Sequence, residues 1–246
     1  MKSIIYNWGQ FPKILCDEYH VTNYTDIINI VKTKDYIIAR GNGRCYGDAS
    51  LAKNIISTLY LNKILSFNEI NGVICCQAGV ILDDILKEIV PKGFFLPVTP
   101  GTKFITVGGA LASDIHGKNH HIDGVFSDHV LSFKLINQEG DIITVDRNDD
   151  LFIQTAGGMG ITGIIIEITF SLKKIETSFI VQKSIRASNL QEIFHLFEKY
   201  KNTTYSVAWI DCLATGNDIG KSILLLGEHA NGDEVSFKNK AITLRK

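Results

Sequence analysis

Apolar residues recur at helical spacing in three stretches of the chain, which predicts three amphipathic helices. These helices are expected over residues 25–32, 82–90 and 190–200. Pro91 and Gly93 mark the end of the second helix, because proline cannot continue a helix and glycine favours its C-terminal cap. In the third helix, Ile193, Phe194 and Phe197 are expected to share the buried face.

Shorter apolar runs bounded by turn residues predict β-strands. The dipeptide Asn71-Gly72 predicts a two-residue hairpin, and Glu139-Gly140 predicts a second hairpin. Helices and strands are interspersed without an internal repeat, so the expected fold class is α+β. The predicted strands cover residues 36–39, 56–61, 64–67, 73–77, 130–136, 142–145, 161–172, 206–212 and 222–226.

The character of the sequence changes near residues 175–178, which predicts a domain boundary. We expect one domain over residues 1–176 and a second over residues 177–246. Residues 231–246 are polar and contain no obvious terminating element. They are expected to be either a loose tail or the point at which a longer gene was cut.

Composition narrows the class of protein. Of the 246 residues 45% are hydrophobic and 21% charged, which is typical of a folded chain. With a net charge of −1 the chain has no excess of basic residues, so no nucleic-acid partner is expected. No apolar run is long enough to span a bilayer. The five cysteines form no CxxC pair and are expected to be reduced thiols in a cytoplasmic protein.

Residues 158–163 read Gly-Met-Gly-Ile-Thr-Gly and match the pattern G-x-G-x-x-G. The Rossmann fingerprint requires a strand before this pattern and a helix after it, because the helix N-terminus holds the pyrophosphate. Here the preceding residues have a helical pattern and the following residues have a strand pattern. We therefore reject a Rossmann nucleotide site at this position.

A second glycine-rich segment, residues 40–48, follows the predicted strand 36–39. Gly41, Gly43 and Gly47 allow positive φ angles and a close approach of the backbone to a ligand. Successive backbone N–H groups in such a loop can form a nest for phosphate oxygens. The alternative is a tight connection between strands, and this segment by itself is compatible with both.

A third segment contains Gly108-Gly109 at the start of a predicted short helix, residues 110–115. Small residues throughout would let a flat ligand lie against the backbone, and a helix start favours negative charge. Four histidines follow within fourteen residues, His116, His120, His121 and His129. The spacing of the first two would suit a metal on a helix, but Gly117 and Asn119 interrupt it and no HExxH motif exists. We therefore expect no metal site, and the absence of G-x-S-x-G argues against a nucleophilic triad.

Five segments together resemble the vanillyl-alcohol-oxidase/PCMH-type FAD-binding family. They are residues 41–48, 100–102, 107–109, 114–121 and 157–162. Within that family, residues 114–121 (DIHGKNHH) and 206–213 resemble the branch of decaprenylphosphoryl-β-D-ribose 2-oxidases. The resemblance runs from about Trp8 to about Ala230. It implies a PCMH-type fold of two α/β subdomains that hold FAD, followed by the start of a substrate-binding cap.

The resemblance also implies the cofactor contacts. The backbone of residues 40–49 would wrap the pyrophosphate, and Gly101, Thr102 and residues 106–109 would line the diphosphate and ribityl chain. Residues 113–116 would lie along the isoalloxazine edge. Ile164 would contact the adenine half. The expected FAD-binding residues are Arg40, Gly41, Asn42, Gly43, Arg44, Cys45, Tyr46, Gly47, Asp48, Ala49, Gly101, Thr102, Thr106, Val107, Gly108, Gly109, Ser113, Asp114, Ile115, His116 and Ile164.

Covalent members of the family carry a histidine inside the phosphate loop, which this loop lacks, so non-covalent FAD is expected. Cys45 is a conceivable thioether donor instead. His116 is the candidate catalytic residue, expected to lie adjacent to the flavin and to tune it by hydrogen bonding, with a structural role as the alternative. His120, His121 and His129 are expected to be structural or to line the edge of the substrate.

The implied activity is oxidation of a sugar hydroxyl by an FAD-dependent oxidoreductase. The substrate would be a polyprenyl-phosphate pentose on the route to cell-wall arabinan, and a separate NAD(P)H-dependent reductase would complete the epimerisation. Alternatives are an alditol or aldonolactone oxidase, or a non-catalytic flavin-binding subunit or fragment. Related oxidases are longer and place a catalytic base in their C-terminal part. A second chain supplying that half is therefore an expected partner, and the expected location is cytoplasmic, peripheral at the inner face of the membrane.

Overall fold

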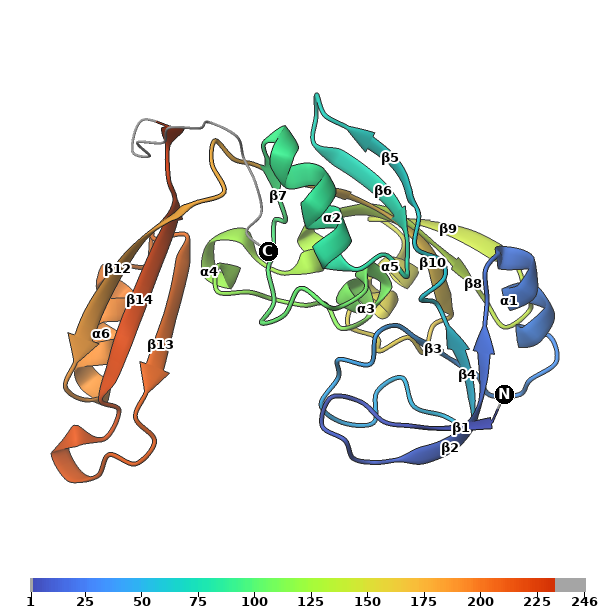
Figure 1. Cartoon of the computed structure of the whole chain (residues 1–246), viewed down its shortest axis with the longest axis horizontal. Helices are drawn as coiled ribbons and strands as arrows, with labels where there is room; N and C mark the ends of the chain where they lie inside the picture. Colours follow the sequence, from blue (N-terminus) through green and yellow to red (C-terminus); the bar gives the residue numbers. More distant parts are fainter. Residues whose placement is uncertain (1, 233–246) are drawn as a thin grey trace.

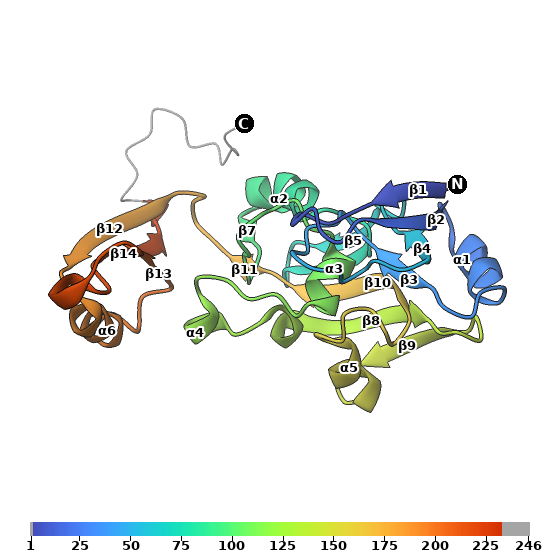
Figure 2. The ribbon, with the colours of Figure 1, turned by 90° about the horizontal axis from the view of Figure 1, so that it is seen from below.

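Residues 2–232 are described by a computed structural model of the chain, in which helices and strands are interspersed along the sequence (Figure 1). Two larger sheets and their helices make up most of the molecule. A third sheet lies at one end of the long axis in both views, away from the N-terminus (Figures 1 and 2). The fold is of mixed α/β class, and the predicted tail over residues 231–246 falls almost entirely outside the described residues.

The first sheet has the strand order β1-β2-β4-β3. Strand β1 runs antiparallel to β2, whereas β2 and β3 both run parallel to β4. Strand β3 begins later than predicted, because Tyr36 lies in the preceding bend with 83% of its surface exposed. The strands are β1 (Lys2–Ile5), β2 (Ile14–His20), β3 (Ile38–Arg40) and β4 (Asn54–Ser57).

The parallel pairing of β3 with β4 defines the role of the glycine-rich segment between them. Two parallel neighbours cannot be joined by a tight turn, because the chain has to return along the sheet before it enters the second strand. Residues 41–53 therefore form a long connection without regular structure. The interpretation of these glycines as a tight connection between strands is wrong.

The second sheet has the order β5-β6-β10-β8-β9, with every neighbouring pair antiparallel. Both predicted hairpins are confirmed. The first turns through residues 69–72 rather than through two residues, with Gly72 at a φ of 68°. The strands are β5 (Ile64–Asn68), β6 (Val73–Gln77), β8 (Val130–Ile136), β9 (Ile142–Asp146) and β10 (Ile164–Ser171).

One apolar cluster joins the first sheet to the second. It packs Ile27 and Val31 of helix α1 (Tyr24–Val31) against Ile56 of β4 and Ile164 of β10. All four side chains are at most 3% exposed. Because the two sheets share this cluster, the loop that leaves β3 is held beside the start of β10.

A larger core packs helices α2 and α3 onto the second sheet. Helix α2 ends as predicted, with a 3₁₀ turn at Val90–Lys92 and Gly93 at a φ of 81°. Helix α5 precedes residues 158–163 and β10 follows them, which confirms that this glycine pattern is not a Rossmann fingerprint. The remaining elements here are α2 (Leu82–Ile89), β7 (Phe94–Phe95), α3 (Val107–Ala112), α4 (His120–Asp123), a 3₁₀ turn (Phe126–His129), α5 (Asp150–Thr155) and β11 (Lys173–Lys174), which pairs with β7.

The third sheet has the order β12-β14-β13 and is antiparallel throughout. Helix α6 covers one face and buries Ile193 and Leu196. The expectation that Phe194 is buried is wrong. This side chain is 61% exposed because each residue advances the helix by about 100°, away from the face that touches the sheet. The elements are β12 (Ile180–Ala187), α6 (Leu190–Lys199), β13 (Tyr205–Ile210), a 3₁₀ turn (Gly216–Asp218) and β14 (Ser222–His229).

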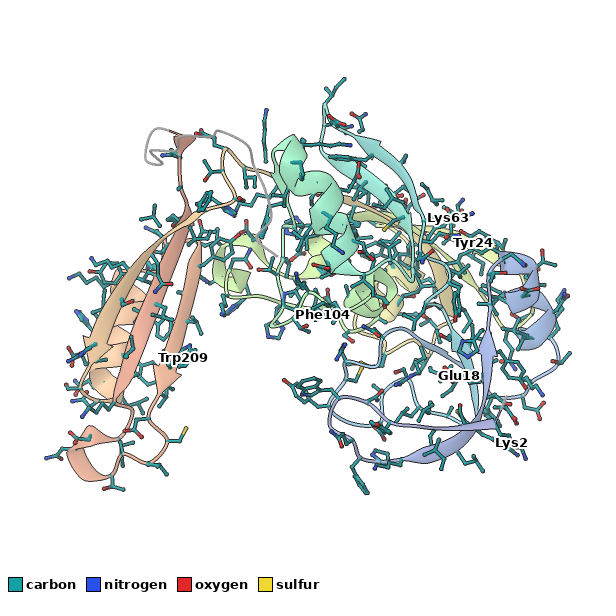
Figure 3. All side chains as sticks on the ribbon, viewed as in Figure 1. Lys2, Glu18, Tyr24, Lys63, Phe104 and Trp209 are labelled. Carbon is teal, nitrogen blue, oxygen red and sulfur yellow. The ribbon has the colours of Figure 1, made fainter. Side chains whose placement is uncertain are left out.

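The opposite face of the third sheet is uncovered by any described helix, and β13 and β14 contribute apolar residues to it. Trp209 of β13 and Ile223 of β14 are cross-strand partners and are 70% and 44% exposed (Figure 3). Exposed neighbouring apolar residues of this kind are typical of a surface that contacts a ligand or more polypeptide.

Candidate functional site

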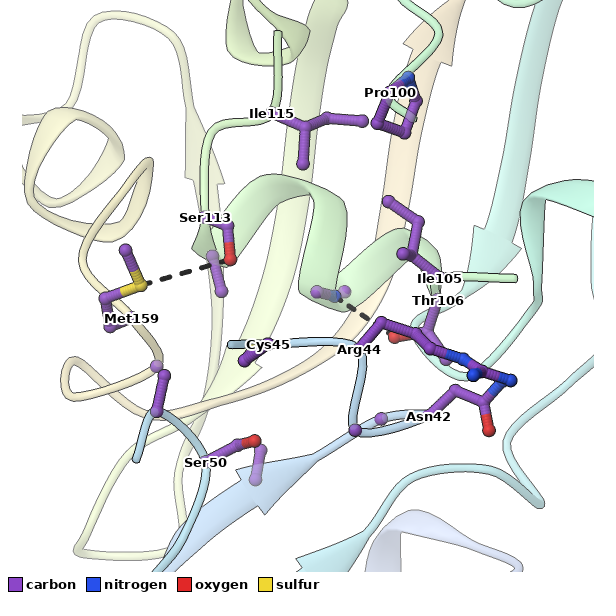
Figure 4. A pocket seen from close by; sticks show the side chains of 18 of the residues that line it. Asn42, Arg44, Cys45, Ser50, Pro100, Ile105, Thr106, Ser113, Ile115 and Met159 are labelled. Carbon is purple, nitrogen blue, oxygen red and sulfur yellow. Dashed lines mark hydrogen bonds between the residues drawn. The ribbon is translucent and has the colours of Figure 1, made fainter. Parts of the chain in front are cut away.

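A cleft of about 820 Å³ opens between the loop after β3, the segment before α3 and the start of β10 (Figure 4). Its volume lies within the usual range of cofactor pockets, about 300–1,000 Å³. Glycine and alanine contribute much of the wall, from Ala39 and Gly41 on one side to Gly108, Gly109 and Ala112 on the other. Walls of small residues expose backbone, so a large planar ligand can lie directly against the main chain.

The loop of residues 42–48 provides unused hydrogen-bond donors. Within residues 2–232, none of its backbone N–H groups donates to a protein acceptor. Backbone N–H groups are obligatory donors, so an array of them beside a cleft is available to ligand oxygens. The long loop, rather than a helix end, is therefore the anion-binding element of the site.

Asn7, from the N-terminal segment, holds this loop in place. Its side chain is 2% exposed, and its Nδ2 donates to the carbonyl oxygens of Gly47 and Ala49, both at 2.7 Å. Its Oδ1 accepts from the guanidinium of Arg40. Trp8 N–H also donates to the carbonyl of Gly43 at 3.0 Å. The loop is thus shaped by residues that precede it by about 40 positions.

A second set of contacts fixes the loop to the opposite wall. Asn42 Nδ2 donates to the carbonyl oxygen of Phe104 at 2.8 Å. Gly41 passes so close to Thr106 that a Cβ at this position would collide with the threonine side chain. Glycine is required here by the close approach of the two walls.

Helix α3 begins at Val107 rather than at Ala110, and its N-terminus does not offer free donors. Val107 N–H donates to Val80 O at 2.9 Å, and Gly108 N–H to Ala78 O at 2.8 Å. Gly109 N–H donates to Oγ1 of the cap residue Thr106 at 3.2 Å (Figure 4). The expectation that this helix start attracts an anion is therefore not supported, because its first-turn donors already have protein acceptors.

Most of the predicted cofactor-binding residues line the cleft. Those that do are Gly41, Asn42, Gly43, Arg44, Cys45, Tyr46, Ala49, Gly101, Thr102, Thr106, Gly108, Gly109, Ser113, Ile115 and His116. They come from two segments that are far apart in the sequence, residues 41–49 and 101–116. The fold brings these segments together around a single space.

Six predicted residues do not line the cleft. Gly47 and Asp48 lie at the exposed outer end of the loop, and Arg40 is engaged with Asn7. Asp114 instead holds Ser127, accepting from its backbone N–H at 2.9 Å and its hydroxyl at 3.0 Å. The other two are core residues, Val107 at 0% and Ile164 at 3% exposure.

The cleft also contains residues that the list of predicted contacts lacks. Gly163 and Ile165 line it on either side of the buried Ile164. The alternation of β10 could have indicated this, since successive side chains of a strand point to opposite faces. Trp8 and Phe104 also line it, and no local pattern marks either of them.

The histidines have separate surroundings. His116 lines the cleft beyond the end of α3, and its ring centroid lies 6.1 Å from that of His120. The other three each bond a backbone carbonyl: His120 that of Gly117, His121 that of Thr203, and His129 that of Asp123. No group of three or more metal-ligating side chains is found among the described residues.

The histidine-rich segment, residues 116–129, contacts the third sheet. Lys118 O accepts from Ser206 N–H of β13 at 2.9 Å. Nearby, Tyr205 Oη and His229 Nε2 lie 3.2 Å apart. Burial raises the pKa of Tyr205 to about 12 and lowers the pKa of His229 below its ordinary value. Both groups are therefore favoured in their neutral forms at this junction.

Comparison with known proteins agrees with this site. Residues 20–146 match the FAD binding domain family, which is just over half of the chain. The chain therefore belongs to this family of FAD-linked oxidoreductases. No helix in residues 2–232 has the length and apolarity needed to cross a membrane.

Two of the individual relatives match a longer part of the chain than the FAD binding domain family does. The decaprenylphosphoryl-β-D-ribose oxidase of Mycolicibacterium smegmatis is 37% identical over 211 residues, covering 82% of this chain and 45% of that protein. The mitochondrial D-2-hydroxyglutarate dehydrogenase of Arabidopsis thaliana is 27% identical over 209 residues, covering 76% of this chain and 37% of that protein. The D-lactate dehydrogenase of Anaerostipes hadrus is 32% identical over 125 residues, covering 48% of this chain and 26% of that protein. The chain spans less than half the length of these relatives.

The residues of the cleft fit FAD. The open N–H groups of residues 42–48 suit a diphosphate, and the small residues of α3 suit a flat ring. A side chain at Gly101 would meet no atom within 4 Å, so the wall there is open to a ligand. Arg44 provides a positive charge, and no Asp or Glu of residues 2–232 lines the cleft to oppose an anion.

Proposed function

We propose that this chain is an FAD-dependent oxidoreductase that oxidises a secondary hydroxyl of a polyprenyl-phosphate pentose. The observation that supports the cofactor is the cleft, with its open N–H groups on residues 42–48. The substrate class is supported by the 37% identity with decaprenylphosphoryl-β-D-ribose oxidase. That match covers 82% of the chain, which is more than residues 1–176, so part of it lies in the predicted cap.

Bound FAD supplies the hydride acceptor for such an oxidation. The chain itself binds the diphosphate through the loop of residues 42–48 and supports the isoalloxazine with the backbone of α3. His116 lies on the cleft wall where α3 has ended. Its ring nitrogens can hold a hydroxyl or a flavin edge by hydrogen bonding, so we assign it the orienting role in the reaction.

The third sheet is assigned to the substrate. Its uncovered face, which includes Trp209 and Ile223, offers apolar area to a prenyl chain or to further cap polypeptide. The part of the relatives that this sequence does not match would supply such cap polypeptide, either on the same chain or on a separate chain. A product ketone would then need an NAD(P)H-dependent reductase to complete an epimerisation. We place the reaction in the cytoplasm, at the inner face of the membrane.

The first experiment is the visible absorbance spectrum of the purified chain before and after acid precipitation. We expect an oxidised-flavin spectrum, with the colour released into the supernatant, because the loop contains no histidine for covalent attachment. Colour retained in the pellet of the native chain but released from a Cys45→Ser variant would identify a thioether and overturn non-covalent binding. A chain that takes up no FAD at all would refute the proposal.

The substrate is tested by anaerobic bleaching of the flavin. A prenyl-phosphoryl ribose is expected to bleach it, alone or after addition of polypeptide corresponding to the rest of the relatives. Bleaching by xylitol or gulonolactone instead would indicate an alditol or aldonolactone oxidase, and bleaching by D-lactate a hydroxy-acid dehydrogenase. A flavin that no alcohol bleaches would indicate a non-catalytic subunit or fragment.

A further inference from the structure

The hairpin of β1 and β2 has the inverse of the usual distribution of polar and apolar side chains. Asn7, just after β1, and Cys16 of β2 are buried, both 2% exposed. Ile4 and Leu15 are cross-strand partners, and they are 68% and 63% exposed. An antiparallel sheet normally turns its polar side to water, so this apolar side is suited to a surrounding that is less polar than water.

The same side of the hairpin continues to its turn. Tyr6 and Lys13 follow at the next alternate positions, and Lys13 Nζ lies 5.1 Å from the ring centroid of Tyr6. Phe11, in the turn itself, is 78% exposed. We call these residues the hairpin face, which consists of Ile4, Tyr6, Phe11, Lys13 and Leu15. The hairpin face therefore combines large apolar and aromatic groups with a lysine held above a ring.

The charge on this hairpin is positive. Residues 1–16 contain two lysines, Lys2 and Lys13, and no Asp or Glu. Asp17 is the cross-strand partner of Lys2, at the end of the hairpin that is remote from the turn. Next to the turn, the hairpin itself therefore offers a positive charge without a carboxylate to neutralise it.

This combination of side chains fits the surface of a bilayer better than the surface of a protein. Aromatic residues are enriched where lipid meets water, and a lysine there extends its ammonium group toward the headgroups. Protein–protein interfaces, in contrast, are depleted of lysine. A layer of anionic headgroups complements the positive charge of residues 1–16 and attracts each lysine close to it.

The hairpin turn is also fixed to one wall of the cleft. Trp8, in this turn, lines the cleft, and its N–H donates to Gly43 O at 3.0 Å. In Figure 1 the β1–β2 hairpin lies along the lower edge of the molecule, whereas the turn between β5 and β6 is at the upper edge. A surface that binds the hairpin face is therefore brought next to the cleft.

We propose that the hairpin face is a docking surface for an anionic phospholipid bilayer, and that docking brings the cleft next to a substrate held in the membrane. The second part rests on the proposed function, because the long apolar chain of a polyprenyl-phosphate pentose partitions into a bilayer. Phe11 and the Ile4–Leu15 pair enter the headgroup region, and Lys13 remains at the level of the phosphates. Apolar burial and charge act together, since stable peripheral binding requires more than one weak signal.

The test is co-sedimentation of the full chain with vesicles of phosphatidylcholine alone or with added phosphatidylglycerol. We expect binding to the anionic vesicles that weakens as salt is added, because salt screens the attraction to the lysines. The double variant Ile4→Thr/Leu15→Thr keeps a side chain that is favourable in strands, and it should bind about 10-fold more weakly. Lys13→Gln should weaken binding to anionic vesicles by about fivefold and leave binding to neutral vesicles unchanged.

Two substitutions elsewhere on the surface are the matched controls. Ile70, in the turn between β5 and β6, is 97% exposed, so Ile70→Thr removes an equally accessible apolar side chain from the opposite edge of the molecule (Figure 1). Lys63→Gln removes an exposed lysine outside the hairpin. Both should bind vesicles like the native chain, and circular dichroism establishes that each variant is folded.

The remaining outcomes overturn the assignment. A native chain that does not bind anionic vesicles, or a double variant that binds them equally well, would refute the docking surface. Sedimentation velocity without vesicles tests the other occupant. A dimer that dissociates in the double variant would assign the hairpin face to a second copy of the chain.

Flavin bleaching by a water-soluble, short-chain prenyl-phosphoryl ribose separates this inference from the proposed function. The double variant should bleach like the native chain, because its two substitutions lie outside the cleft. Bleaching without vesicle binding would refute the docking surface and leave the proposed function intact. Vesicle binding without bleaching by any alcohol would refute the proposed function and the link to a membrane substrate, and would leave the docking surface itself supported.

Discussion

The Nζ atom of Lys173 lies 2.9 Å from Oδ2 of Asp123, which also accepts a hydrogen bond from Asn119 at 2.7 Å. Asp123 ends α4, and Lys173 belongs to β11, shortly before the chain enters the third sheet. The part of the histidine-rich segment from His116 to Asp123 therefore runs from the cleft to this ion pair. The cleft and the third sheet are connected through one short segment of the chain.

Removing the carboxylate at this position should destabilise the fold. The side chains of Lys173 and Asp123 are 28% and 19% exposed, so water replaces the lost contacts only in part. We expect Asp123→Asn to lower the free energy of unfolding by about 1–3 kcal/mol, measured by urea denaturation. Glu198→Gln is the control, because the Glu198–Lys201 pair is 3.9 Å apart and largely exposed. Equal effects of the two substitutions would contradict a stabilising role for the Lys173–Asp123 ion pair.

The contact region between the third sheet and the rest of the chain should also make the free energy of unfolding depend on pH. His229 Nδ1 lies 3.3 Å from Thr177 O, and its ring is 5.1 Å from that of Phe95. Burial, assisted by the charge of Lys173, lowers the pKa of His229 below 6.5, so the folded chain binds a proton less readily than the unfolded chain. The stability contributed by neutral His229 is therefore fully present above about pH 6.5 and is lost as the pH falls below that value.

This dependence is measured by urea denaturation at several values between about pH 5 and pH 7. The His229→Gln variant should lose less stability on acidification than the native chain. His195→Gln, at an exposed position of α6, should behave like the native chain. The prediction fails if the His229 variant and the native chain have the same slope.

Two glycines of the loop should respond differently to alanine. A Cβ on Gly41 would collide with Thr106, whereas a Cβ on Gly47 would meet no atom within 4 Å. We expect Gly41→Ala to cost about 1–3 kcal/mol of stability in the FAD-free chain, because one wall of the cleft has to move. Gly47→Ala should leave the stability nearly unchanged. A similar loss for both variants would mean that backbone entropy, not close approach, selects glycine at position 41.

Trp8 should report on the cofactor directly. The chain has two tryptophans, and Trp8 lines the cleft while Trp209 lies on the third sheet. In a Trp209→Phe variant, added FAD should quench the remaining tryptophan emission strongly, because energy transfer to a flavin falls steeply with distance. A Trp8→Phe variant should show weaker quenching. Equal quenching in the two variants would place the flavin elsewhere.

The sequence by itself determined those features that depend on neighbouring residues. The inverted order of helix and strand around residues 158–163 excluded a Rossmann site, and Asn71-Gly72 and Glu139-Gly140 marked the two hairpins. Local chemistry is sufficient in such cases, because periodicity and glycine spacing report on the backbone within one or two turns. The local pattern was insufficient for Phe194, which is apolar but exposed.

Only the tertiary structure decided which groups of the site remain free. The sequence predicted donors at the start of α3, but the carbonyls of Val80 and Ala78 already accept from them. It assigned Arg40 and Arg44 alike to FAD binding. In the structure the guanidinium of Arg40 donates to Asn7, whereas that of Arg44 remains available to a ligand. Strand pairing and the packing of distant segments place such partners, and no local pattern encodes contacts between residues separated by about 40 positions.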